Sequence, residues 1–417
     1  MNILLKSAKI IDPNSGFHQK IQDILIEKGI ITKVSKNIPP KSNYKVVEIE
    51  NLHVSQGWFD SSVSFGEPGY EERETIENGL KTAARSGFTA VAVNPNTNPV
   101  IDTNADVSFL KSKALNNPVD LYPIGALTVK SEGIDLAEIY DMKNAGAVAF
   151  GDYQKAISNP NLLKIALQYA QNFNGLVLSF PQENKIAGKG NVNEEETSTK
   201  LGLKGIPALA EELQITRDLF ILEYTGGKLH IPTISTAKSV LLIKEAKKKG
   251  LDVTCSVAIH NLLLTDDVLA EFNSNYKVLP PLRSKNDVKA LIKGLNDHVI
   301  DFVTSDHNPI DIENKRVEFD NAKYGIIGLE SAFGALNKVV SLEKTIELLT
   351  RGRERFGLET YGIKEGEKAN LSLFNPDMEY TFGEENIISI SKNSAFIGAK
   401  LKGKAYGVVS NGQLVQN

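Results

Sequence analysis

The sequence has almost no cysteine and no long hydrophobic run. Cys255 is the only cysteine among 417 residues, which excludes an intrachain disulfide and a multi-cysteine zinc site. No apolar run approaches the roughly 20 residues that span a bilayer. Residues 1–16 alternate like a strand and lack the long apolar stretch of a signal peptide. We therefore expect a cytoplasmic protein without a membrane partner.

An excess of charge of one sign is also missing. The chain carries 47 basic and 51 acidic residues, for a net charge of −4. Such a balance gives no general attraction to nucleic acid, and no glycine-rich nucleotide loop or basic-aromatic pattern stands out. We expect no nucleic-acid partner. Hydrophobic residues make up 41% of the chain and charged residues 24%, which is typical of a globular protein with a large core.

Both ends of the chain are rich in short strand candidates. Near the N-terminus, Asp23–Ile26 is an example, and near the C-terminus Tyr406–Ser410 precedes Asn411-Gly412, a strong hairpin turn. Two β-rich ends around a different middle predict one small β-sandwich. Its two parts are residues 1–55 and 357–417.

The middle of the chain, residues 56–356, alternates apolar strands with helical stretches. Repeated βα units with apolar strands predict a parallel sheet covered by helices. About eight units fit, so within the α/β class a (β/α)₈ TIM barrel is favoured over an open sheet. The main strand candidates are 90–93, 121–125, 147–150, 176–178, 229–231, 253–257 and 302–304, and the helical stretches are 75–86, 161–172, 235–249 and 285–296.

Nine short motifs then occur in the order of a known family. Each is weak alone, but nine in order are a specific signal, and through them essentially the whole chain resembles the dihydroorotases of the metal-dependent amidohydrolase superfamily. The motifs are Glu67-Pro68-Gly69, Glu74-Thr75-Ile76-Glu77, Gly87–Val91, Pro95–Pro99, Gly146–Phe150, Leu262–Asp266, Pro280–Ser284, Ser305-Asp306-His307 and Gly325–Glu330.

The resemblance implies a barrel of the metal-dependent hydrolase type. In active members one or two zinc ions activate water, which opens the ring of dihydroorotate and reversibly forms N-carbamoyl-aspartate in pyrimidine biosynthesis. Those members carry a His-x-His pair at the end of the first barrel strand, where this chain has Ser62 and Ser64. Residues two apart on a strand face the same way. Both positions therefore offer neutral hydroxyls, which are poor zinc ligands.

The other ligand positions implied by the family are changed as well. The third histidine position is Phe180, and the fourth is Thr233, although His230 in the same segment is retained. The substrate-binding arginine aligns with Gly66, which removes a bidentate partner for a substrate carboxylate. A histidine that holds substrate aligns with Ile310.

Three polar residues of the family pattern remain. Asp152 matches an aspartate that bridges two metals, Asp306 matches the catalytic general base, and Asn96 matches a residue that contacts substrate. Each has a structural alternative. We interpret Asp152 as a buried acid held by backbone amides. We interpret Asp306 as a vestigial general base that is held in the same way. Asn96 also suits a turn. We interpret His230 as a satisfied histidine inside the barrel.

Three functions remain open. We favour a degenerate dihydroorotase-like protein without zinc or any other cofactor, which acts as a structural or regulatory partner of aspartate transcarbamoylase, as degenerate relatives do, and forms a homodimer. The alternative is an active dihydroorotase with a rearranged site, with one zinc ion on Asp152, Asp306 and His307. The third is a small-molecule sensor in which Asn96 and Arg283 bind an anion at the barrel mouth.

Overall fold

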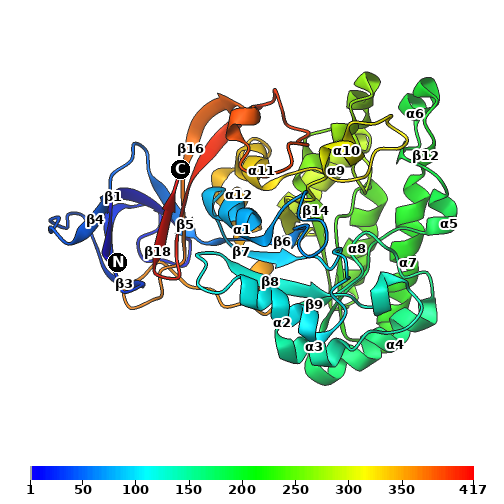
Figure 1. Ribbon diagram of the computed structural model, residues 1–417, viewed down its shortest axis with the longest axis horizontal. Helices are drawn as coiled ribbons and strands as arrows, with labels where there is room; N and C mark the ends of the chain where they lie inside the picture. The colour runs from blue at the N-terminus through cyan, green and yellow to red at the C-terminus, as the bar shows by residue number, and fades with distance from the viewer. Residues whose placement is uncertain (1) are drawn as a thin grey trace.

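Eight parallel strands form the barrel of the computed structural model, which describes residues 2–417 (Figure 1). The sheet runs in the order β15-β14-β13-β10-β9-β8-β7-β6, and a bridge between Val63 and His307 brings its two edges together. The predicted α/β class and eight-stranded barrel are confirmed. The strands are β6 (Trp58–Val63), β7 (Phe88–Val93), β8 (Asp120–Gly125), β9 (Ala149–Phe150), β10 (Leu176–Leu178), β13 (Lys228–Ile231), β14 (Val253–Ala258) and β15 (Phe302–Thr304).

Helices surround the barrel, and several begin at residues whose side chains cap them. Thr75 accepts a hydrogen bond from the backbone of Asn78 at the start of α1, and Ser284 forms a capping box at the start of α9. The larger helices are α1 (Ile76–Arg85), α2 (Asn104–Lys113), α3 (Ile139–Ala145), α4 (Pro160–Ala170), α7 (Ala208–Thr225), α8 (Ala237–Lys248), α9 (Lys285–Asn296), α11 (Leu329–Leu336) and α12 (Leu342–Thr350). Short elements connect them: α5 (Asn184–Ala187), β11 (Val192–Asn193), α6 (Glu196–Leu201), β12 (Gly205–Ile206), α10 (Ile312–Lys315) and α13 (Gly352–Arg355).

Helix α7, with 18 residues, is not among the helices that the sequence predicts. Its apolar side chains lie on both of its faces. Leu219 and Leu222 face the barrel, whereas Phe220 and Tyr224 are exposed. A helix that is apolar on both faces lacks the one-sided pattern that identifies a surface helix.

Both ends of the chain meet in a second sheet beside the barrel (Figure 1). The strands of this sheet lie in the order β18-β17-β16-β5-β1-β2-β3. The end of β1 pairs with β5, and the start of β1 pairs with β4. The two layers of the expected sandwich are therefore parts of one branched sheet. Its strands are β1 (Asn2–Ile11), β2 (Ile21–Glu27), β3 (Ile30–Ser35), β4 (Tyr44–Val47), β5 (His53–Gln56), β16 (Leu371–Thr381), β17 (Lys400–Ser410) and β18 (Gln413–Gln416).

The segment between β16 and β17 returns to the barrel. Glu330 accepts hydrogen bonds from the backbone of Ile388 and Ser389, at 3.2 and 3.0 Å, and Glu74 accepts one from the backbone of Ile390 at 3.2 Å. Both acids belong to family-like motifs. These two motif residues therefore hold the segment between β16 and β17 in place and do not line the barrel mouth.

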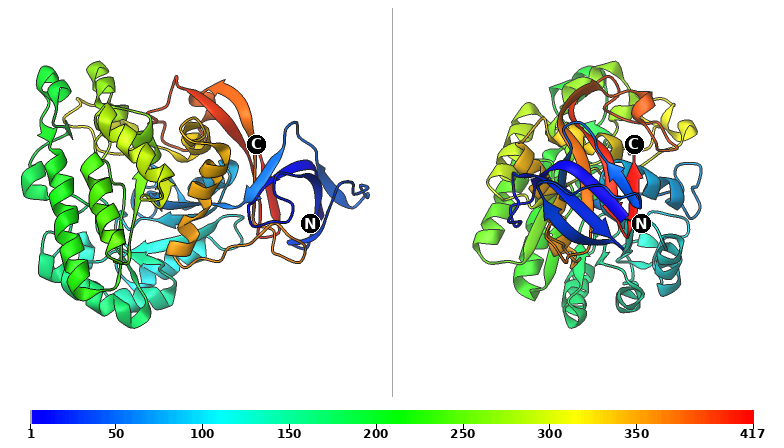
Figure 2. Two further views of the ribbon diagram at one scale, coloured as in Figure 1. Left: turned by 180° about the vertical axis from the view of Figure 1, so that it is seen from behind. Right: turned by 90° about the vertical axis from the view of Figure 1, so that its left-hand side faces the viewer.

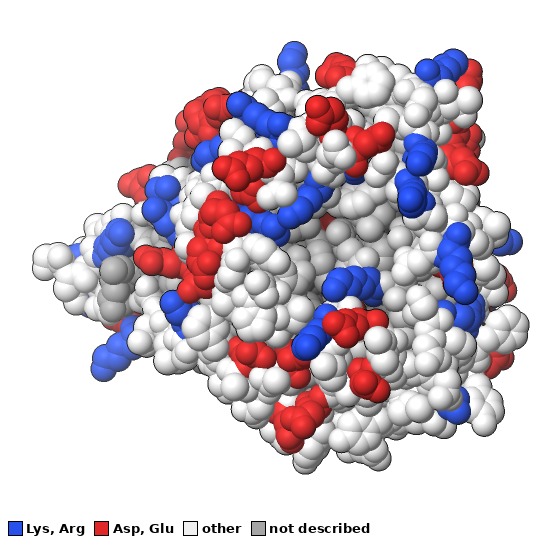
Figure 3. All heavy atoms as spheres, turned by 45° about the vertical axis from the view of Figure 1, so that its right-hand side comes forward, with Lys and Arg blue, Asp and Glu red and all other residues white. Residues whose placement is uncertain are grey.

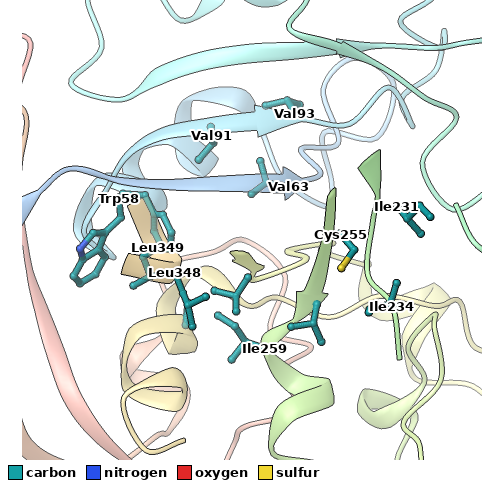
Figure 4. Close-up of a cluster of buried hydrophobic side chains, with 14 of the residues drawn as sticks. Trp58, Val63, Val91, Val93, Ile231, Ile234, Cys255, Ile259, Leu348 and Leu349 are labelled. Atoms are coloured by element: carbon teal, nitrogen blue, oxygen red, sulfur yellow. The ribbon is translucent and has the colours of Figure 1, made fainter. Parts of the chain in front are cut away.

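The largest hydrophobic core lies between the barrel sheet and its helices. Figure 4 shows part of it, with Val63 on β6, Val91 and Val93 on β7, and Cys255 on β14. Cys255 is fully buried there, and burial raises the pKa of its thiol. The single cysteine is therefore a packing residue.

Charges of both signs are mixed over the face that Figure 3 shows. None of the helices in residues 2–417 combines the length and the apolar character that crossing a membrane requires.

Candidate functional site

The two serines of the first barrel strand are hydrogen-bonded to neighbouring side chains at the barrel mouth. Ser62 Oγ donates to Asp306 Oδ1 at 3.1 Å, and Asn94 Nδ2 donates to Ser62 Oγ at 3.1 Å and to Ser64 Oγ at 3.2 Å. All four residues are buried. The structure brings both serines and Asp306 together here, and it adds Asn94, the residue after β7.

Asp60 ties the first barrel strand to the last one. Its carboxylate accepts hydrogen bonds from the backbone of Ser62 at 3.1 Å and of Ser305 at 2.9 Å, and from the Thr304 hydroxyl. Burial raises the pKa of Asp60. This acid closes the barrel, and its full set of donors shows a structural role.

Asp306 is buried beside these groups, next to Tyr153. The Tyr153 hydroxyl donates to Asp306 Oδ1 at 3.3 Å. Burial, with a smaller contribution from the nearby Asp60 carboxylate, raises the pKa of Asp306 to about 7, although the hydrogen bonds from Ser62 and Tyr153 oppose the rise. Burial also raises the pKa of Tyr153 well above 10, so its hydroxyl remains a donor at neutral pH.

Very little space is left at the mouth. A cavity of about 20 Å³ lies between the side chains of Ser62, Tyr153, Phe180, His230 and Asp306. That volume holds about one water molecule. A six-membered ring with its carboxylate enters only if these side chains move.

The positions of the third and fourth family histidines face the same cavity. Phe180 contributes only carbon atoms, and Thr233 lies in the left-handed region with a φ of 51°. His230 stacks on Phe302, with ring centroids 4.9 Å apart, and its Nδ1 and Nε2 lie 2.9 and 3.2 Å from the hydroxyls of Thr254 and Ser256. Burial lowers the pKa of His230 well below 6.5, so a neutral, hydrogen-bonded ring occupies this corner.

Asp152 and His307 do not face the cavity. Asp152 Oδ1 accepts hydrogen bonds from the backbone of Leu127 at 2.9 Å and of Thr128 at 3.0 Å, so this acid holds the loop after β8. His307 Nδ1 accepts from the backbone of Gly328 at 3.1 Å. Burial lowers the pKa of His307 to about 4 and that of His260 to about 3, so both rings are neutral at pH 7.

The three substrate positions that the family resemblance implies also lie outside the cavity. Gly66 is in a tight turn, where a Cβ atom would lie 1.8 Å from the Tyr70 carbonyl oxygen, so no arginine fits without moving the backbone. Ile310 lines a groove near Asp311 instead of the cavity. Asn96 is half-buried, and within residues 2–417 its Oδ1 has no hydrogen-bond partner.

The expectation that Arg283 binds an anion at the barrel mouth is wrong. Arg283 is 2% exposed, and its guanidinium donates to the Ser235 hydroxyl at 3.0 Å and to Asn193 and the Ile206 carbonyl at 2.8 Å each. Its Nη2 also lies 3.8 Å from Glu211. Its Nε and Nη1 donors are used inside the fold, and the burial of the whole side chain keeps it from a ligand at the mouth.

Sequence reasoning missed Asp60, Asn94 and Tyr153. Asp60 precedes Ser62 by two residues on one strand, so strand periodicity already places it on the same face. Asn94 ends a barrel strand, where barrel chemistry is expected. For Tyr153 there was no such signal, because it lies in a loop with a φ of 55°.

The residues at the family's zinc positions do not fit zinc. Two are serines whose hydroxyls are hydrogen-bonded within the protein, one is a phenylalanine and one is a threonine. Across residues 2–417, no three His, Cys, Asp or Glu side chains converge in a way that holds a metal ion. Zinc sites need about three or four nitrogen, sulfur or carboxylate donors. This cavity offers Asp306 and His230, and both ring nitrogens of His230 lie within hydrogen-bond distance of Thr254 and Ser256.

The barrel and its branched terminal sheet define an amidohydrolase-like architecture. Among solved structures, an L-hydantoinase (dihydropyrimidinase) from Arthrobacter aurescens matches with a TM-score of 0.86 and 22% identity, covering 100% of this chain and 96% of that one. A dihydropyrimidinase from Brevibacillus agri NCHU1002 matches with a TM-score of 0.84 and 18% identity, covering 100% and 95%. At these identities the likeness concerns the fold.

Sequence comparison identifies the family. A family model described as dihydro-orotase-like matches residues 53–239. A dihydroorotase from Pelotomaculum thermopropionicum is 38% identical, covering 100% of this chain and 98% of that protein, and one from Geotalea daltonii is 37% identical, covering 100% and 99%. The chain belongs to the dihydroorotase family.

Proposed function

We propose that this chain is a degenerate member of its family, a pseudoenzyme that does not open the dihydroorotate ring. The observation that carries the proposal is the hydrogen-bonded group of Ser62, Asn94, Tyr153 and Asp306, which occupies the barrel mouth. Ring opening in the family depends on zinc, and these side chains do not supply its donors. The cavity of about 20 Å³ also admits the substrate only if its lining side chains move.

We propose further that the chain acts in pyrimidine biosynthesis as a structural or regulatory partner of aspartate transcarbamoylase. The support is the family resemblance, since degenerate relatives assemble with that enzyme. A protein that keeps a complete fold of 417 residues without its chemistry needs another selected role, and binding the preceding enzyme of the same pathway provides one.

Metal content and turnover test the first part. The chain is expressed in zinc-supplemented medium, and zinc is measured by mass spectrometry together with dihydroorotate hydrolysis. An active dihydroorotase purified in the same way is the control. We expect well below one zinc per chain and no turnover above background. Stoichiometric zinc with turnover would contradict the proposal.

Co-purification with the aspartate transcarbamoylase of the same organism tests the second part. We expect a complex on gel filtration that survives Asp306→Asn, because the barrel mouth is internal and takes no part in assembly. Separate elution of the two proteins at micromolar concentration would refute the partnership but leave the loss of catalysis standing.

Two observations favour an active enzyme with a rearranged site. Asp306 has a pKa of about 7, which suits a general base at neutral pH, and the full-length relatives described above are named dihydroorotases. For such an enzyme, Asp306→Asn abolishes turnover. The same hydrolysis assay therefore separates the two functions.

A further inference from the structure

The segment between β16 and β17 is held on the barrel by two acidic side chains. Glu330, on α11, accepts the backbone N–H groups of Ile388 and Ser389 through Oε1, and the same oxygen accepts the Ser389 hydroxyl at 2.6 Å. Glu74, just before α1, accepts the backbone N–H of Ile390 through Oε2. Figures 1 and 2 show from opposite sides how this segment leaves the terminal sheet and returns to the barrel. The backbone N–H groups of three consecutive residues are therefore bound by two carboxyls.

The two carboxyls share a neighbour, and one of their oxygens has no donor. The Ser389 hydroxyl, which donates to Glu330, also interacts with Glu74. Glu74 is 0% exposed, and its Oε1 accepts a hydrogen bond from Asn78 Nδ2 at 2.8 Å. Glu330 Oε2 is buried, and in the part of the chain that the structure describes it has no hydrogen-bond partner. A buried acceptor of this kind lowers stability unless it gains a donor, and a proton held between the two acids would provide one.

The cations around the two acids have other partners. Lys392, on the segment itself, donates to two backbone carbonyls of the same segment, at 2.7 and 3.2 Å. Arg73, next to Glu74 in sequence, pairs with Asp311 at 3.3 Å. The charged group that acts on Glu74 is therefore Glu330, which has the same sign.

Ionisation of Glu74 is unfavourable while the segment is in place. Burial, with a smaller contribution from the Glu330 charge, raises the pKa of Glu74 from 4.5 to about 7, although hydrogen bonds from Asn78 and Ile390 oppose the rise. When the segment lifts, water reaches the carboxyl and its pKa returns toward 4.5. Glu74 therefore binds its proton more tightly in the closed state. The closed state is fully favoured at low pH and becomes less favoured as the pH rises through 7.

We propose that Glu74, Glu330 and Asn78 form a proton-controlled clasp, which holds the segment between β16 and β17 while Glu74 is protonated and releases it when Glu74 ionises. Asn78 belongs to the clasp because its amide donates to the Ile388 carbonyl at 3.2 Å as well as to Glu74. The segment forms one wall of a groove of about 730 Å³, to which Ile390 contributes an apolar side chain, and α10 lies on the other wall. Release of the segment therefore widens this groove and exposes its apolar wall.

The size of the effect follows from the pKa of Glu74 in the closed and lifted states. The rise from 4.5 to about 7 corresponds to an about 300-fold weaker hold on the segment at pH values well above 7. Between pH 5 and pH 8 the hold is expected to weaken about 70-fold, because part of the loss lies outside this range. Hydrogen exchange measures such local opening along the backbone.

Hydrogen–deuterium exchange of the full chain at pH 5, 6, 7 and 8 tests the clasp. After correction for the intrinsic pH dependence of exchange, the protection of residues 388–390 is expected to fall about 70-fold across this range, while a peptide from β15 reports global unfolding. Glu74→Gln is expected to keep its protection at all four pH values, because the amide resembles the protonated acid: it accepts from Ile390 and carries hydrogens of its own. Glu77→Gln is the matched control, since Glu77 lies three residues further along and is exposed, and it is expected to follow the parent chain.

Glu330→Gln is a second variant, which keeps an oxygen for Ser389 but removes the charge beside Glu74. Its protection is expected to fall less with pH than that of the parent chain, and it decides the question together with the parent profile if Glu74→Gln does not fold. Three results would overturn the proposal: protection of residues 388–390 that falls no more than that of β15, a Glu74→Gln profile like that of the parent, or a Glu330→Gln profile like that of the parent. Each readout is independent of zinc, turnover and aspartate transcarbamoylase, so failure here is distinct from failure of the proposed function.

Discussion

Asp306→Asn is expected to stabilise the protein increasingly as the pH rises. The carboxyl of Asp306 titrates at about 7 in the fold, against 3.8 for an unperturbed aspartate. Between these values the folded state binds more protons than the unfolded state, so the free energy of unfolding falls as the pH rises. Asparagine keeps an oxygen for Ser62 and Tyr153 but does not ionise, so the variant avoids this loss.

The size of the effect follows from the two pKa values. Each tenfold change in an ionisation constant is worth about 1.4 kcal/mol, so the full cost of burying the ionised Asp306 side chain is ~4 kcal/mol above pH 7. About 3 kcal/mol of it develops between pH 5 and pH 8. With an unfolding entropy of ~2 cal/mol/K per residue, that corresponds to a melting temperature difference of about 3 °C.

The assay is a melting curve of the parent protein and of Asp306→Asn at pH 5, 6, 7 and 8. The difference between the two melting temperatures reports the titration of Asp306, because the other groups titrate equally in both proteins. Asp135→Asn, on an exposed side chain, is the control and is expected to give a constant difference. If the difference between Asp306→Asn and the parent does not grow with pH, or if it reverses, Asp306 is not the costly buried acid described above. A holoenzyme in which a metal stabilises the carboxylate would show that reversal.

Three further predictions concern the stability of the fold. Dialysis against a strong chelator is expected to shift the melting temperature by less than about 1 °C, because the proposed pseudoenzyme has no zinc whose binding is linked to folding; a larger fall that zinc reverses would contradict this. Gly66→Ala is expected to destabilise the protein by about 2–4 kcal/mol, because the added Cβ atom would lie 1.8 Å from the Tyr70 carbonyl oxygen. Gly16→Ala is the control and is expected to change the stability little, since nothing lies within 4 Å of its Cβ position. Equal melting temperatures of the two variants would refute the prediction for Gly66. Arg283→Lys is expected to cost about 3–5 kcal/mol in urea unfolding, because lysine does not replace the donors to Asn193 and Ile206; a loss under about 1 kcal/mol would contradict this.

The barrel was predictable because its strands are buried on both faces. Leu176–Leu178 and Phe302–Thr304 are short, fully buried runs, and such runs between helical patterns indicate a parallel sheet. Helix α9 was found at its full length because Ser284 caps it and one face is polar. Helix α7 escaped prediction because its outer face is also apolar, so the one-sided pattern of a surface helix is missing.

The site was predictable only as far as the family pattern identifies positions. Ser62 and Asp306, which the family pattern assigns to one site, are hydrogen-bonded to each other, since aligned positions on one fold meet in space. Arg283 was misplaced, because a motif does not reveal whether its side chain points to solvent or into a network with Asn193 and Glu211. Tyr153 was missed, since the conformation of its loop depends on contacts distant in sequence.

The hydrogen bonding at the barrel mouth argues against simple decay of an active site. Substitutions that only removed ligands would leave buried donors and acceptors unpaired, at about 1–3 kcal/mol each. Instead Ser62 has both a donor and an acceptor partner, Asn94 serves two hydroxyls, and Tyr153 donates to Asp306. His260 is a contrast, since in residues 2–417 neither of its nitrogens has a partner. Under the proposed function, side chains that satisfy one another in this way indicate selection for a stable, closed barrel end.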